Sequence, residues 1–205
     1  MSLADTIVAL ATPVGESAIG AVRLSGPECD DLTAKIFRLP SPTPRVANLA
    51  SYRNLRDQIL DEVVFIYYEE GGSYTGESSL EIFCHGNPLI LNKVVNDLLE
   101  RGCRMAQPGE FTRIAFTSGK MELIQAESVA SLIRARSERA LEVANRHLSG
   151  ETGRRILALR DRMIAIMAQL EAYVDFPEDD LPSENVDGVV GKLNELENEL
   201  SKAAE

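Results

Sequence analysis

One short stretch of this sequence brings together side chains that could bind a small polar molecule. A turn-rich loop leads into residues 79–86, where polar and apolar side chains alternate up to a glycine. Because successive side chains of a strand point to opposite faces, Glu81, Phe83 and His85 are expected to share one face. A carboxylate, an aromatic ring and an imidazole in a row suit a polar heterocycle better than a hydrophobic core.

The segments around this stretch predict an α+β domain. Residues 5 to about 120 alternate strand-like and helix-like signals. Apolar runs bounded by glycine and proline predict strands at residues 6–11, 19–24 and 62–68. Mixed signals of this kind are typical of an α+β fold.

Proline and glycine also mark two helices in this region. Pro27 opens a short helix that is expected to reach Phe37. After the alternating strand, Asn87 has the properties of an N-cap and is followed by a proline, which is favoured at the first helical position. This second helix is expected to end near Arg101, with Gly102 just beyond it.

The sequence changes character beyond Glu122, where good helix formers dominate and no proline occurs before Pro177. Gly150 and Gly153 predict a break between two long helices. Six apolar residues of the second helix recur at alternating spacings of three and four, which is typical of a coiled-coil seam. They are Ile156, Leu159, Met163, Ile166, Leu170 and Tyr173.

The end of the helical region carries two further expectations. Residues 176–180 should end the second helix, and residues 189–204 should form a third, charged helix. The apolar seam needs partners that could come from another chain or from residues beyond Glu205. The helices are therefore expected to be part of an incomplete bundle.

Composition limits the classes of protein that fit. A chain of 205 residues is long enough for one large domain or two small ones. No apolar run approaches the length of a membrane span, and no secretory signal pattern opens the chain, so a cytoplasmic location is expected. Cys29, Cys84 and Cys103 form no C-x-x-C pair, and reduced, buried thiols are the expected state.

The charge is distributed unevenly. The formal net charge is -11, and residues 171–205 hold eleven acidic side chains against two lysines. Residues 134–162 instead hold eight arginines against four acidic side chains. An acidic chain is poorly suited to binding nucleic acid alone, because phosphate neutralisation dominates such affinity. The arginines could contact RNA or an acidic partner, but a solvated helix face is the simpler interpretation.

Several blocks of the sequence, taken together and in order, resemble the MnmE (TrmE) family of GTPases, which modify the wobble uridine of certain tRNAs. The match extends over about the first 180 residues. The blocks are DTIVALATP (5–13), AVRLSG (21–26), SYTGESSLEIFCHG (73–86), PGEFT (108–112), AF (115–116), GK (119–120), QAE (125–127) and VDFP (174–177).

The resemblance implies a particular organisation. Residues 1–120 would form an N-terminal α+β domain, similar to the folate-binding domain of one-carbon aminomethyltransferase-type enzymes, which binds folate and dimerises. Residues 121–205 would begin the helical domain, ending before the family's inserted GTPase domain. The chain is therefore expected to be a fragment, consistent with its lack of a G-x-x-x-x-G-K-[ST] motif.

The resemblance also implies the activity of the intact protein. It would be a homodimeric GTPase that requires potassium and magnesium. With the flavoprotein MnmG it would add an aminomethyl-type group to carbon 5 of the wobble uridine, using a tetrahydrofolate one-carbon unit.

Three residues match the family's site for 5-formyltetrahydrofolate, namely Arg23, Glu81 and Lys120. A pterin ring presents an amino group beside a ring N–H, and such paired donors fit a bidentate carboxylate such as Glu81. The two bases are plausible counter-charges for the acidic tail of folate, and which base meets which part stays open. Each residue also has a simpler interpretation as a solvated strand or turn side chain. No catalytic or metal-binding residue is expected in this segment.

Two other functions remain open at this stage. A self-sufficient folate-dependent transferase would need a nucleophile or base beside the pocket, for which His85, Cys84 and Glu77 are the candidates. A module that only dimerises would need no binding residues. Tyr74 and Phe83 could stack on a pterin, although core packing is the simpler role for both.

Overall fold

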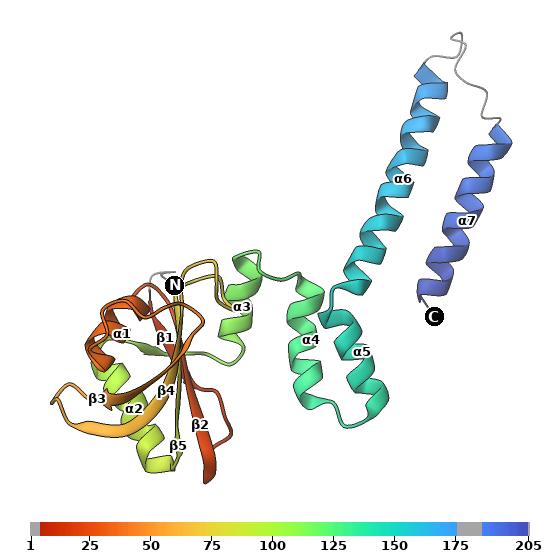
Figure 1. Cartoon of the computed structure of the whole chain (residues 1–205). Coiled ribbons are helices and arrows are strands. Elements are labelled where there is room, and N and C mark those ends of the chain that lie inside the picture. The colour runs from red at the N-terminus through yellow and green to blue at the C-terminus, as the bar shows by residue number, and fades with distance from the viewer. Residues whose placement is uncertain (1–4, 176–185, 205) are drawn as a thin grey trace. The chain divides into compact units, whose positions relative to one another are not determined.

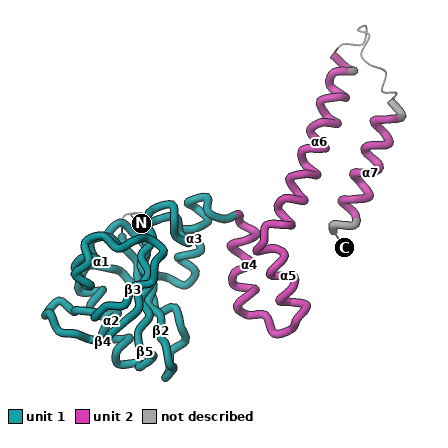
Figure 2. Tube along the Cα trace, in the orientation of Figure 1, with its two compact units in different colours: residues 1–121 teal, residues 122–205 magenta. Residues whose placement is uncertain are grey.

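The computed structural model of the chain describes residues 5–175 and 186–204. The chain divides into two compact units, Met1–Met121 and Glu122–Glu205 (Figure 2). The first unit contains a mixed sheet with helices, and the second is built of helices alone (Figure 1). The predicted fold class, an α+β domain followed by long helices, is confirmed.

The sheet of the first unit has six strands in the order β3-β4-β5-β2-β1-β6. Neighbouring strands are antiparallel except β1 and β6, which are parallel. The strands are β1 (Ile7–Leu10), β2 (Ser17–Ser25), β3 (Ala47–Arg53), β4 (Ile59–Tyr68), β5 (Ser79–Gly86) and β6 (Arg104–Met105).

The sequence predicted four of these strands and missed the two at the sheet's edges. β3 reads ANLASYR, in which alanine, serine and asparagine are weak strand formers. It becomes a strand because it pairs along its length with β4. β6 has only two residues and exists through its pairing with β1. Tertiary pairing, which local propensity does not report, forms both.

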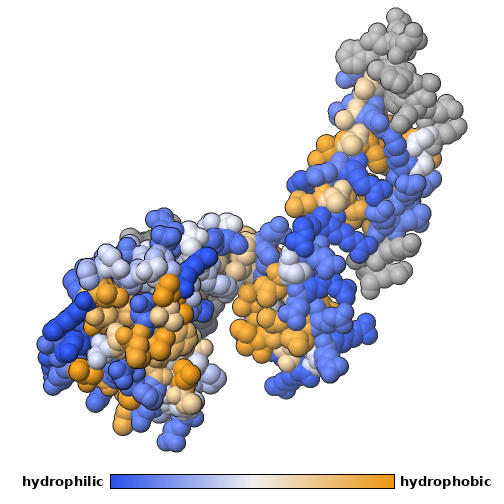
Figure 3. Space-filling model, in the orientation of Figure 1, coloured by the Kyte–Doolittle hydropathy of each residue, from blue (hydrophilic) through white to orange (hydrophobic). Residues whose placement is uncertain are grey.

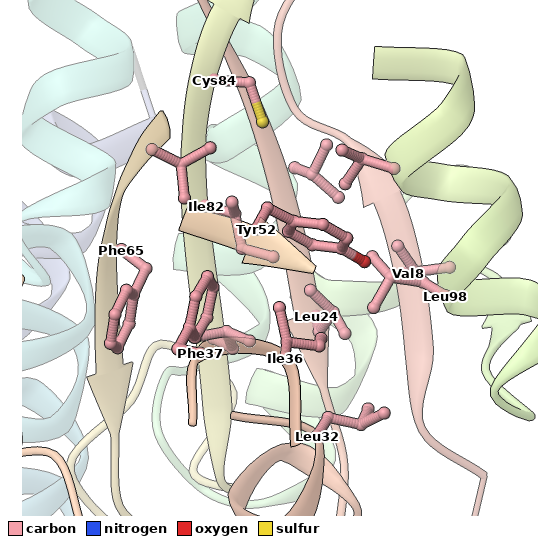
Figure 4. Close-up of a cluster of buried hydrophobic side chains, with 14 of the residues drawn as sticks. Val8, Leu24, Leu32, Ile36, Phe37, Tyr52, Phe65, Ile82, Cys84 and Leu98 are labelled. Carbon is pink, nitrogen blue, oxygen red and sulfur yellow. The ribbon is translucent and has the colours of Figure 1, made fainter. Parts of the chain in front are cut away.

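Two helices, α1 (Cys29–Phe37) and α2 (Pro88–Glu100), pack on the same face of the sheet. Between them and the strands lies one continuous core (Figure 4). The alternation in β5 is as predicted, since Leu80, Ile82 and Cys84 are buried in this core. A third helix, α3 (Glu110–Thr117), follows β6.

The predicted ends of α2 are confirmed. The Asn87 side chain accepts a hydrogen bond from the Leu89 amide at 2.8 Å, and Pro88 is the first helical residue. Gly102 follows the C-cap residue with a φ of 102°, in the left-handed region that favours glycine. These caps fix where the chain leaves β5 and where it returns toward β6.

The opposite face of the sheet is not covered by α1 or α2. Strand register places Leu49, Val64, Phe83 and Ala21 in one row across β3, β4, β5 and β2. Leu49 is 70% exposed, and the others are exposed or half-buried. We call these four residues, Leu49, Val64, Phe83 and Ala21, the open-face row. Figure 3 shows in orange that hydrophobic side chains occur on the surface of both units.

The helical unit has one more break than the sequence predicted. It comprises α4 (Leu123–Arg134), α5 (Glu138–Leu148), α6 (Glu151–Asp175) and α7 (Val186–Ala204). The first expected long helix is divided between α4 and α5, where Ser137 acts as an N-cap and accepts a hydrogen bond from the Ala140 amide. A serine before a helical run was the available signal for this boundary.

Only one of the two glycines expected to break the helices does so. Gly150 lies between α5 and α6 with a φ of 72°. Gly153 instead lies inside α6, and a Cβ added there would be 2.1 Å from a carboxylate oxygen of Glu122. Gly153 therefore permits close packing against the start of α4, and its prediction as a break was wrong.

The apolar seam of α6 is only partly covered. Leu159 and Ile166 are buried against Val189 and Leu196 of α7, in a small second core. The seam's Ile156, Met163 and Leu170 are 51%, 43% and 42% exposed. The predicted third helix is present and starts slightly earlier, at Val186, whereas the segment 176–180 lies outside the described residues.

Candidate functional site

Two of the predicted site residues, Arg23 and Glu81, form an ion pair on the uncovered face of the sheet. They are directly opposite each other in the register of β2 and β5. The Arg23 Nε and Nη2 atoms lie 2.9 and 2.7 Å from the same oxygen of Glu81, Oε1. The second oxygen, Oε2, has only a long contact of 3.4 Å with the Tyr68 hydroxyl. Glu81 therefore keeps one oxygen available for a ligand.

A hollow of about 110 Å³ lies beside this ion pair. It is lined by strand residues of β2, β4 and β5, by the loop before β5 and by an aromatic ring of α3. The lining residues are Arg23, Tyr68, Tyr74, Thr75, Ser79, Glu81 and Phe111.

Two aromatic rings lie close to the guanidinium group of Arg23. The Arg23 guanidinium carbon lies 5.7 Å from the centre of the Tyr74 ring and 6.0 Å from that of Phe111. Contacts of this length are attractive cation–π interactions. The Tyr74 hydroxyl also bonds with Thr112 at 3.0 Å, which ties the loop before β5 to α3.

The third predicted residue, Lys120, lies near the pocket's loop but does not line the hollow. Its ammonium group donates to the Gly71 carbonyl at 2.8 Å. A Cβ added at Gly76 would approach the Lys120 side chain to 3.1 Å, so this side chain passes against the same loop. The structure thus brings Arg23 and Glu81 together and holds Lys120 against the loop before β5, with its charged end exposed.

The other side chains of the predicted ligand face have different positions. His85 is bound to Asp61, with 2.8 Å between Nδ1 and Oδ1, and its side chain is 70% exposed. Neither His85 nor Phe83 lines the hollow, whereas Tyr74 does. Phe83 belongs to the open-face row.

Four residues that line the hollow were not predicted from the sequence, namely Tyr68, Thr75, Ser79 and Phe111. The register explains part of this, because Tyr68 is opposite Ser79 and reaches the site only when β4 and β5 pair. Thr75 and Phe111 lie within blocks that carry the family resemblance, and this was the signal in the sequence that could have assigned them to the site.

Cys84, one of the three candidates for a transferase nucleophile or base, is poorly suited to that role. Cys84 faces the core, and burial raises the pKa of its thiol to about 12. Cys29, Cys84 and Cys103 are free, buried thiols, as expected. Since the thiolate is the nucleophilic form, thiols like Cys84 are inert at neutral pH.

Within residues 5–175 and 186–204, no group of three or more histidine, cysteine or acidic side chains is placed to hold a metal ion. In the same described segments, no helix is both long and apolar enough to cross a membrane.

Comparison with known proteins gives matches to both units. Residues 6–120 match the family model described as the N-terminus of the GTP-binding protein TrmE, and residues 123–205 match the MnmE helical domain. A tRNA modification GTPase MnmE from Opitutus terrae is 47% identical over 200 residues, which is 98% of this chain and 44% of that relative. One from Aquifex aeolicus is 45% identical over 204 residues, or 98% of this chain and 46% of the relative. The chain therefore spans less than half the length of these curated relatives.

Proposed function

Since this chain belongs to the MnmE family, we propose that it forms the folate-binding and helical part of a tRNA modification GTPase. The observation that carries the proposal is the Arg23–Glu81 pair beside a hollow, in the unit that matches the TrmE N-terminus. The free oxygen of Glu81 can accept a charge-assisted hydrogen bond from an N–H donor of a pterin ring.

The ligand we propose is 5-formyltetrahydrofolate or a related tetrahydrofolate, bound through Arg23, Glu81 and Lys120. Pockets that enclose a whole small molecule usually measure about 300–1,000 Å³. The hollow of about 110 Å³ therefore suits only the pterin end. The acidic tail would extend over the loop toward Lys120, whose charged end is exposed.

The full-length protein would have a wider role. We propose that it hydrolyses GTP with potassium and magnesium, through a domain in the part of the relatives' length that this chain does not span. In the cytoplasm, it would act on tRNA with the flavoprotein MnmG, adding an aminomethyl-type group to carbon 5 of the wobble uridine. The folate bound at Glu81 would supply the one-carbon unit.

The same unit is proposed to form a homodimer. The open-face row of Leu49, Val64, Phe83 and Ala21 offers apolar side chains on a face that the unit's own α1 and α2 do not cover. Apolar surface of this kind is typical of protein interfaces. A second copy of the first unit is the partner we propose for it.

Calorimetric titration with 5-formyltetrahydrofolate, together with light scattering, tests the proposal. We expect a dimer that binds the ligand, and an affinity at least tenfold weaker in Glu81→Ala, because charge-assisted hydrogen bonds contribute about 1.5–3 kcal/mol each. Glu62→Ala removes an exposed carboxylate of β4 outside the hollow and should change nothing.

Two results would contradict parts of the proposal. Unchanged affinity in Glu81→Ala would reject the assignment of the site. A well-folded dimer of the wild-type chain that does not bind 5-formyltetrahydrofolate at all would reject the folate role and leave a dimerisation module.

A further inference from the structure

A chain of buried hydroxyl groups lies behind the hollow. Ser25 and Thr75 are 0% and 1% exposed, and their oxygens are 2.7 Å apart. Ser25 Oγ donates to Glu77 Oε2 at 2.8 Å. Thr75 lines the hollow, so this series of hydrogen-bonded hydroxyl groups connects the Glu77 carboxylate to the wall that a ligand would contact.

The positions of the hydroxyl hydrogens follow from this connection. A hydroxyl group has one hydrogen to donate and two lone pairs that can accept. Because Ser25 donates its hydrogen to the Glu77 carboxylate, it must accept the hydrogen of Thr75. Thr75 then has no hydrogen left for a ligand, and its oxygen can only accept.

The remaining neighbours leave the Thr75 oxygen with spare capacity. The Ser73 hydroxyl oxygen lies 3.2 Å from Thr75 Oγ1, but its hydrogen is donated to the Glu77 carbonyl at 2.5 Å. The Ser79 hydroxyl and the Glu77 amide lie 3.3 Å from Thr75 Oγ1. These contacts are longer than the usual 2.5–3.2 Å of strong hydrogen bonds.

We propose that Thr75 is a specificity-determining residue of the folate site, with Ser25 and Glu77 as positioning residues that fix its hydroxyl as an acceptor. The inference rests on the proposed function of the pocket. Glu81 would accept one hydrogen of the pterin 2-amino group through its nearly free oxygen, Oε2. Thr75 Oγ1 would accept the second amino hydrogen, which Glu81 cannot reach.

This arrangement selects for an amino group at that position. Glu81 and Thr75 both line the hollow, and in this proposal Glu81 Oε2 and Thr75 Oγ1 are the two acceptors offered to a ligand. A ligand with N–H donors satisfies both. A ligand with a methyl group there leaves them unpaired, and a site with unpaired buried polar groups rejects such an analogue.

Titration of the chain with two ligands tests the assignment. The ligands are 5-formyltetrahydrofolate and its 2-desamino-2-methyl analogue. Thr75→Val should weaken binding of the amino ligand about three- to tenfold, the usual effect of one neutral hydrogen bond. It should leave affinity for the analogue within about twofold, because the analogue makes no bond to Thr75.

Two further variants separate recognition from a merely structural role. Thr75→Ser keeps the hydroxyl group and should retain the wild-type preference for the amino ligand. Ser25→Ala leaves the Thr75 hydroxyl without its fixed acceptor and should reduce the same preference by a smaller factor. Should Thr75→Val fail to fold, as judged by circular dichroism, Ser25→Ala still provides the test.

A matched control is available in Thr33→Val. Thr33 is also fully buried, but its hydroxyl donates to the Cys29 carbonyl within α1, away from the hollow. This variant should bind both ligands as the wild type does.

The possible results distinguish this inference from the proposed function. If Thr75→Val lost the same affinity for both ligands, or lost none for either, the role of Thr75 would be overturned. Glu81 would remain the ligand-binding group. Absence of binding by the wild-type chain would reject the folate function itself, and the Thr75 assignment with it.

Discussion

Two glutamates of the first unit, Glu81 and Glu110, both pair with arginine but have different capacities for a ligand. Glu110 is 3% exposed, and both of its oxygens are occupied by Arg104, Arg113 and the Gln107 amide. These bonds, with that from Arg104 the strongest, lower the pKa of Glu110 to about 2. Glu81 keeps one oxygen nearly free. Glu110 therefore stabilises the fold, whereas Glu81 is suited to binding.

Glu110→Gln should lower the free energy of unfolding by about 1–3 kcal/mol at pH 7, because charged hydrogen bonds are lost in a buried position. The folded-state pKa lies below the ordinary value of 4.5. The contribution of Glu110 is therefore full above pH 4.5 and declines as the pH falls toward 2. Denaturant unfolding of both proteins between pH 7 and pH 3 measures this difference.

The control for this experiment is Glu62→Gln, which removes an exposed carboxylate of β4 that has no arginine partner among the described residues. It should have little effect at any pH. A stability difference between wild type and Glu110→Gln that stays constant down to pH 3 would contradict the role given to the ionised group.

At the scale of elements, the turn after β2 controls the placement of the site. β2 contributes Arg23 and Ser25, and Gly26 follows directly. Gly26 has a φ of 140°, and its amide donates to the Ser78 carbonyl at 2.9 Å. A Cβ there would lie 2.6 Å from the backbone Cα of Thr6, so the end of β2 fits against the start of β1 only with glycine.

Gly26→Ala should therefore destabilise the first unit by about 2–4 kcal/mol, since backbone strain and a backbone clash add together. Gly102→Ala is the matched control, because Gly102 also has a positive φ but has open space around it. Its cost should be only about 1 kcal/mol of conformational strain. Thermal unfolding measures both variants, and an equal loss of stability in the two would show that the contact with Thr6 is unimportant.

At the scale of the whole chain, the two units have separate cores. The first core includes residues of helices α1 and α2 and of strands β1 to β5, whereas the second consists of Leu159, Ile166, Val189 and Leu196 between α6 and α7. A core of four side chains provides little burial energy for two helices of 25 and 19 residues. The α6–α7 pair should be the least stable part of the described chain.

Ile166→Ala should open the α6–α7 pair, because removal of a buried isoleucine usually costs about 2–5 kcal/mol. Hydrogen exchange followed by mass spectrometry should show faster exchange in both helices and no change in the first unit. Ile164→Ala is the control, since Ile164 lies on the same helix and is 56% exposed. Loss of protection in the first unit would contradict the separation of the two cores.

The sequence by itself determined the features that depend on neighbouring residues. The alternation in β5, the cap of α2 at Asn87 and the helical character beyond Glu122 all follow from local patterns, and the structure has them. Arg23, Glu81 and Lys120 were identified as a set by family resemblance, and their role in binding stays a prediction.

Only the tertiary structure decided how distant residues meet. Arg23 and Glu81 are 58 positions apart and become an ion pair through the register of β2 and β5. The loop before β5 places Thr75 within 2.7 Å of Ser25, and pairing with β4 makes the edge segment β3 a strand. Register and pairing depend on how whole strands bury their apolar faces, and a pattern of neighbouring residues does not contain that information.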